Sequence, residues 1–70
     1  MERLNTAPKG NHTVKWLFAE PEVERVLKKI CIEEGSDIKV LFHIGNHSTA
    51  VRSSKGKYII GAEVASLITV

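Results

Sequence analysis

The chain has 70 residues, of which 43% are hydrophobic and 26% charged, and its formal net charge is +2. This length suits one small domain, residues 1–70, and the composition is that of a folded chain rather than a disordered one. No apolar run approaches the roughly 20 residues that cross a bilayer, and the amino terminus lacks the apolar stretch of a signal peptide. We therefore expect a cytosolic domain without direct membrane insertion. The charge is too small to indicate nucleic-acid binding by itself.

The segment before residue 12 is predicted to be a loop, because Pro8 and Gly10 prevent a continuous helix there. From His12 to Ala19 the residues are rich in β-branched and aromatic types, which predicts a first strand. We assign the aromatic side chains of this strand, and one from a later strand, to the core; these residues are Trp16, Phe18 and Phe42.

A helix is predicted to begin at Pro21, since proline suits the first helical turn and glutamates surround it. Apolar residues then recur at helical spacing, which places Val23, Val26, Leu27, Ile30 and Cys31 on one face. That face needs a partner, so we expect the strands to pack around this helix. Cys31 is then a small buried side chain rather than a reactive thiol.

The rest of the chain reads as short antiparallel strands joined by turns. In chain order we predict a strand at 38–44, a turn at Gly45-Asn46, a strand at 47–53, a turn at 54–56, a strand at 57–60, a helical turn at 61–66 and a strand at 67–70. The fold class is mainly β: a small, partly open barrel of about five strands. One α-helix lies between strands 1 and 2, and a short helical turn precedes the last strand.

Five pieces of sequence, in this order and spacing, carry a family resemblance. They are Ala7-Pro8-Lys9-Gly10, Leu27-Lys28-Lys29-Ile30, Gly35-Ser36-x-Ile38-x-Val40, Ala50-Val51-Arg52, and the closing stretch from Tyr58 to Val70. Together they resemble the FeoA family, ferrous iron transport protein A, over nearly the whole chain. Similar domains form the carboxy-terminal part of iron-dependent repressors of the DtxR type, but no DNA-binding helices precede the barrel here.

The resemblance implies an SH3-like barrel and a cytosolic accessory to ferrous iron uptake. It implies a partner, the cytosolic domain of a FeoB-type membrane transporter, which would recruit the chain to the inner face of the membrane. It implies no catalysis, and the chain has no phosphate-binding loop of its own. Members of the family usually carry glycine where this chain has Cys31, so the helix either continues through Ile32 or ends in a strained conformation.

Two histidines flank the Gly45-Asn46 turn, and on a hairpin His43 and His47 are expected to face each other across two strands. Imidazoles bind Fe(II) and other divalent transition metals, so a transient metal site at this pair is one hypothesis. A stable site needs three or four ligands, and neither a carboxylate nor a cysteine is close to the pair in the sequence. An exposed histidine pair without a metal is therefore the favoured interpretation.

We expect partners to bind the exposed residues of the two hairpins, because loops on a rigid scaffold commonly carry contacts. The predicted docking residues are His43, Asn46, His47, Arg52, Lys55 and Lys57. The basic residues lie near Tyr58, so a small nucleic-acid-binding barrel is an alternative, although we expect no nucleic acid. A metal-binding or metal-sensing module is the other alternative. Self-association through an exposed strand edge stays open.

Overall fold

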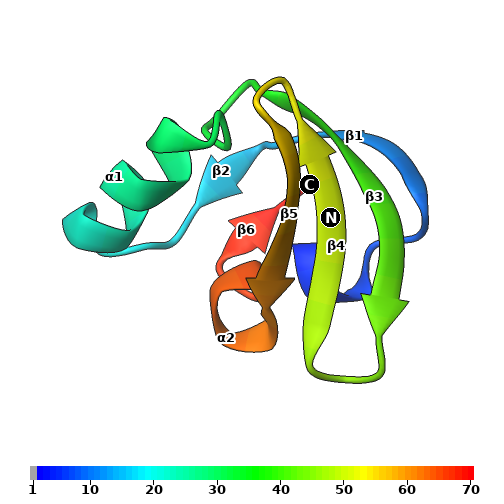
Figure 1. The fold of residues 1–70 in the computed structure, drawn as a ribbon. Coiled ribbons are helices and arrows are strands. Elements are labelled where there is room, and N and C mark those ends of the chain that lie inside the picture. Colours follow the sequence, from blue (N-terminus) through cyan, green and yellow to red (C-terminus); the bar gives the residue numbers. More distant parts are fainter. Residues whose placement is uncertain (1) are drawn as a thin grey trace.

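The computed structural model describes residues 2–70, which form a mainly β structure of six short strands with little helix (Figure 1). The elements are the 3₁₀ turn η1 (Leu4–Thr6), β1 (Gly10–Thr13), β2 (Trp16–Leu17), α1 (Pro21–Lys29), β3 (Asp37–Ile44), β4 (Ser48–Ser53), β5 (Gly56–Gly61), α2 (Ala62–Ala65) and β6 (Ile68–Thr69). Four strands form one antiparallel sheet in the order β1-β3-β4-β5, and β2 pairs with β6 in a second sheet. The predicted partly open barrel with a helical turn before its last strand is confirmed.

The predicted first strand is interrupted in its middle. β1 pairs with β3, whereas β2 pairs with β6, so the chain changes partners between them. The change occurs at Val14, whose N–H donates to the carbonyl of Ser36, and at Lys15, whose N–H donates to the carbonyl of Thr69. Each sheet thus satisfies part of the strand's backbone, and α1 follows the second part.

The helix lies at one edge of the molecule, and the strands do not wrap around it (Figure 1). Of the predicted apolar face only Leu27 is fully buried; Val23 and Ile30 are half-buried, and Val26 is 59% exposed. The expectation that the barrel is organised around α1 is therefore wrong. Among residues 2–70 no helix has the length and apolarity needed to cross a membrane.

The helix ends in a strained conformation rather than continuing through Ile32. Cys31 has a φ of 60°, the left-handed region that favours glycine. The N–H of Ile32 donates to the carbonyl of Leu27, and that of Cys31 to the carbonyl of Lys28, which is the Schellman pattern of helix termination. This geometry buries Ile32 fully and leaves Cys31 partly exposed at the bend, so its assignment to the buried helix face is corrected.

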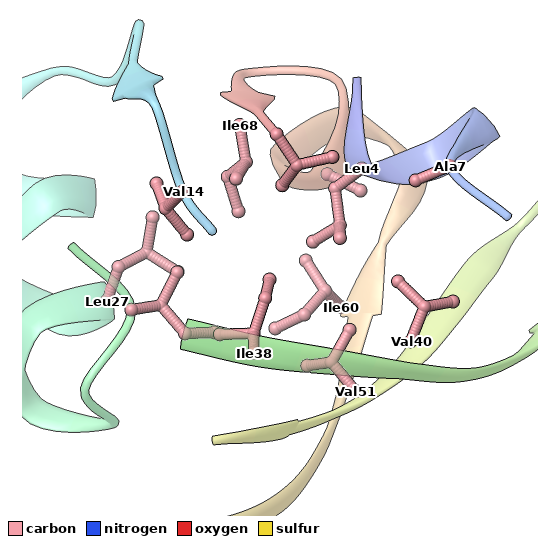
Figure 2. Packing of buried hydrophobic residues seen from close by; sticks show 12 residues of the cluster. Leu4, Ala7, Val14, Leu27, Ile38, Val40, Val51, Ile60 and Ile68 are labelled. Atoms are coloured by element: carbon pink, nitrogen blue, oxygen red, sulfur yellow. The ribbon is translucent and has the colours of Figure 1, made fainter. Parts of the chain in front are cut away.

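The core lies between the four-stranded sheet and a second layer that contains η1, α2 and β6 (Figures 1 and 2). Figure 2 shows side chains from the two layers pointing toward one another, with Leu27 of α1 at one end of the cluster. The buried cluster consists of Leu4, Ala7, Val14, Leu27, Ile32, Ile38, Val40, Val51, Ile60, Ala65, Ile68 and Val70. No aromatic residue belongs to it, which contradicts the assignment of Trp16, Phe18 and Phe42 to the core: all three are exposed.

Candidate functional site

One histidine of the β3–β4 hairpin, His43, contacts both the sheet and the amino-terminal segment. The Nε2 atom of His43 lies 2.7 Å from the carbonyl oxygen of Ala7, and its Nδ1 atom lies 3.0 Å from the hydroxyl oxygen of the buried Thr49. A carbonyl can only accept, so Nε2 carries a proton, and in the neutral ring Nδ1 accepts from the threonine. His43 thereby fastens the segment after η1 to the four-stranded sheet.

The second histidine does not meet the first. Thr49 is the residue opposite His43 across the strands, whereas His47 lies exposed in the turn that begins at Gly45. The prediction that His43 and His47 face each other across the two strands is therefore wrong. His12 also makes a hydrogen bond within the protein, since its Nε2 atom lies 2.7 Å from the carbonyl oxygen of Pro8. Within residues 2–70 no three His, Cys, Asp or Glu side chains gather where they could hold a metal ion.

The six predicted docking residues do not form one surface. His43, Asn46 and His47 belong to the β3–β4 end of the sheet, and the basic residues belong to the β4–β5 end. The length of β4 separates these two ends (Figure 1). The structure thus divides the predicted site into two groups of three.

Two of the predicted basic residues join a third cation on the outer face of the four-stranded sheet. Lys39 of β3 is opposite Arg52 of β4, which in turn is opposite Lys57 of β5. Side chains directly opposite one another share a face of a sheet, and all three of these are exposed. We call Lys39, Arg52 and Lys57 the cation row. Lys55 lies beside it in the β4–β5 turn.

A row of apolar residues crosses the same face two residues before Arg52 in β4, toward the β3–β4 turn. Phe42 of β3 is opposite Ala50, which is opposite Ile59 of β5. Phe42 is 47% exposed and Ile59 is 65% exposed, while Ala50 is buried between them. We call Phe42, Ala50 and Ile59 the apolar row. The exposed Ile44 extends it toward the β3–β4 turn.

A β-bulge explains why Phe42 faces outward. In β3 Val40 pairs with Val51 and Phe42 pairs with Ala50, so Leu41 is an extra residue on this strand. Strict alternation would place Val40 and Phe42 on one face; the inserted residue instead turns Phe42 to the outer face while Val40 stays buried. Lys39 also lies on the outer face. The alternation of Ile38, Lys39 and Val40 in the sequence could have predicted this.

An apolar groove adjoins the apolar row at the edge strand β5. It has a volume of about 580 Å³ and lies between α1 and β5. Val26 and Ile59, both exposed, are among its lining residues, and Glu22 is its only charged one. Because Ile59 belongs to both features, exposed apolar surface continues from β3 over the sheet edge to α1.

The remaining exposed aromatic residues lie on the other sheet. Trp16 and Phe18 form an edge-to-face pair with ring centroids 6.0 Å apart and planes at 85°. Phe18 is 67% exposed. Trp16 belongs to β2 and Phe18 directly follows it, so this pair is distinct from the row that Phe42 begins on β3.

The fold is that of FeoA proteins. A FeoA protein from Chlorobium tepidum matches with a TM-score of 0.84 at 23% identity, over 97% of this chain and 67% of that one. An iron uptake regulatory protein, also FeoA, matches with a TM-score of 0.85 at 16% identity, over 96% of this chain and 91% of that one.

The same fold also occurs inside a longer protein. A manganese-dependent transcriptional repressor matches with a TM-score of 0.83 at 23% identity, over 96% of this chain but only 39% of the repressor. No protein-family model and no curated protein matches the sequence. At such identities the comparisons establish the fold, and the sequence-based resemblance to FeoA is confirmed at that level.

Proposed function

We propose that this chain, on the premise of its FeoA fold, is a non-enzymatic docking module of ferrous iron uptake. Its partner in this proposal is the cytosolic domain of a FeoB-type transporter, which places the chain in the cytoplasm at the inner face of the membrane. The supporting comparison is with FeoA structures, one of which is described as an iron uptake regulatory protein.

The observation that carries the proposal is the exposure of Ile59. A β-branched side chain that is 65% exposed on an edge strand contributes little to the core. It lies where the apolar row meets the α1–β5 groove, so it belongs to a continuous apolar surface rather than to a scattered set. Contiguous apolar patches of this kind mark interaction surfaces in small proteins.

The proposed mechanism needs no chemistry in this chain. If the module binds one conformational or nucleotide state of the transporter domain more tightly than another, it shifts that equilibrium by the difference in binding free energy. A coupling of about 1–3 kcal/mol would change the equilibrium ratio of the two states by roughly 5- to 150-fold. The module thus acts as an effector of the transporter.

The test is a binding titration of the isotopically labelled chain with the purified cytosolic domain of a FeoB-type transporter, followed by amide NMR. We expect shifts or broadening to gather on β5, α1 and the outer face of β3 and β4. Sedimentation of the chain alone checks self-association, which the unpaired edge of β5 also permits. Absence of binding at millimolar concentrations of the transporter domain would overturn the proposal.

A matched pair of variants locates the surface. Ile59→Asp places a charge in the apolar row, and Phe18→Asp places one at a similarly exposed apolar position directly after β2. We expect Ile59→Asp to weaken binding about tenfold or more, as for a residue central to an interface. Phe18→Asp should leave the affinity within about twofold. The opposite ranking would move the docking surface to the Trp16–Phe18 pair.

A further inference from the structure

The cation row is costly for the fold that contains it. Arg52 has Lys39 opposite it on one side and Lys57 opposite it on the other, so its nearest cross-strand neighbours carry its own charge. Like charges directly opposite each other destabilise a sheet. The only carboxylate on the same face of β3 near this row is that of Asp37, and it accepts a hydrogen bond from Thr13 at 2.8 Å. A destabilising arrangement that the fold does not require indicates a ligand that relieves it.

From this arrangement we infer that the outer face of the sheet binds an acidic amphipathic helix of a partner protein. The helix lies across the strands, with apolar side chains on the apolar row and carboxylates on the cation row. The inference deepens the proposed function and rests on it, because it names the chemistry of the segment that the transporter's cytosolic domain would present.

The spacing of the two rows fits such a helix. Neighbouring strands are about 4.8 Å apart, so each row spans about 10 Å from β3 to β5. Two turns of helix rise about 10.5 Å, so carboxylates at positions i, i+3 or i+4, and i+7 match three cations in a row. The rows themselves are two residues apart on β4 and β5, about 6.6 Å, which is less than the roughly 10–12 Å diameter of a helix with its side chains, so one helix can cover both rows.

The chemistry favours a protein over a nucleic acid. Nucleic-acid platforms stack bases on aromatic side chains, and this face offers Phe42 alone beside the aliphatic Ile44 and Ile59. Aliphatic surface beside cations is instead complementary to leucine and glutamate side chains.

The experiment measures affinity for three defined probes. One is a designed two-stripe helical peptide with leucine on one stripe and glutamate on the next; the second has lysine in place of glutamate; the third is a single-stranded oligothymidylate. We expect the wild-type chain to bind the glutamate peptide at least about tenfold more tightly than the lysine peptide, with affinity falling as salt rises from about 50 to about 300 mM. Tighter binding of the oligothymidylate than of the glutamate peptide would overturn the assignment to protein.

Charge reversal then tests the row itself. The variant Lys39→Glu, Arg52→Glu, Lys57→Glu should lose the glutamate peptide and gain the lysine peptide. The control Lys9→Glu, Lys15→Glu, Arg25→Glu makes the same change in net charge at exposed positions outside the row and should keep the wild-type preference. Amide spectra of both variants verify folding, and Arg52→Gln, which adds no new charge, provides a milder second variant. Equal losses in the reversal and control variants would overturn the inference.

The same variants separate this inference from the proposed function. If the wild-type chain and the row-reversed variant bind the transporter's cytosolic domain equally well, the inference fails and the proposed function stands. If the wild-type chain binds the glutamate peptide but not the transporter domain, the proposed function fails and the chemistry of the surface stands.

Discussion

The two faces of the four-stranded sheet use similar residues for opposite purposes. Ile60 and Ile59 are neighbours in β5, yet Ile60 is 6% exposed and packs in the core, whereas Ile59 is 65% exposed. Side chains of the inner face stabilise the fold by packing in the core, whereas side chains of the outer face are accessible to a partner protein. An apolar residue in a strand of this chain is therefore not evidence of a core position until its face is known.

The largest expected effect comes from the inner face. Ile60→Ala should lower the free energy of unfolding by about 2–5 kcal/mol, because it removes buried methyl groups and leaves a cavity. Urea denaturation followed by circular dichroism measures the loss. If that variant is unfolded at the start, Ile60→Val should still cost about 0.5–1.5 kcal/mol. A loss below 0.5 kcal/mol in both would contradict the burial of this side chain.

A smaller loss should follow removal of the histidine that fastens the amino-terminal segment to the sheet. His43→Ala breaks the contacts with Ala7 and Thr49 and should cost about 1–3 kcal/mol, since the buried threonine hydroxyl loses its partner. His47→Ala, in the exposed turn of the same hairpin, is the matched control and should change stability by less than about 0.5 kcal/mol. Equal effects of the two variants would mean that the contacts of His43 contribute nothing.

A gain is expected where the helix ends. Cys31→Gly relieves the strain of the left-handed conformation, which costs an ordinary residue about 1–2 kcal/mol. Glycine also raises the conformational entropy of the unfolded chain, which opposes folding by about 0.5–1 kcal/mol. The net gain should be about 0.5 kcal/mol, measurable as a higher urea midpoint. Cys31→Ala keeps the strain and removes only the thiol, so it should bring no gain.

The smallest expected change in stability belongs to the outer face. Ile59→Ala should alter the free energy of unfolding by less than about 0.5 kcal/mol, because the side chain is largely in solvent. The same variant should weaken binding of the transporter's cytosolic domain by about 1 kcal/mol or more. Parallel losses of stability and binding would erase the distinction between the two faces.

Most of the element order was accessible from the sequence, because the turns are marked by residues with special backbone preferences. The hairpin turns after Ile44 and Ser53 lie where they were predicted, and the closing helical turn and strand follow. The division of the first strand was not accessible from the sequence. The N–H of Val14 donates to Ser36, just before β3, and the N–H of Lys15 donates to Thr69 of β6, and local propensity carries no information on such distant partners.

The candidate surface was predicted only in part. Arg52 and Lys57 were named as docking residues, but their row with Lys39 depends on strand register, which the sequence does not state. Phe42 was assigned to the core because it is one of the few aromatic residues of the chain, whereas the bulge at Leu41 turns it to the outer face. The position of a bulge is set by the packing of the whole sheet, so a periodic pattern read from one strand misses it.

The two ends of the described chain meet. The N–H of Glu2 donates to the carbonyl of Val70 at 3.2 Å, and the N–H of Val70 donates back at 2.8 Å. The first and last described residues are thus adjacent. A host protein could connect to both ends at one place without disturbing the two layers. Such a domain is suited to insertion into a host loop and to circular permutation, because neither requires the chain to be stretched. A fold with this property can be carried within longer proteins as a portable unit.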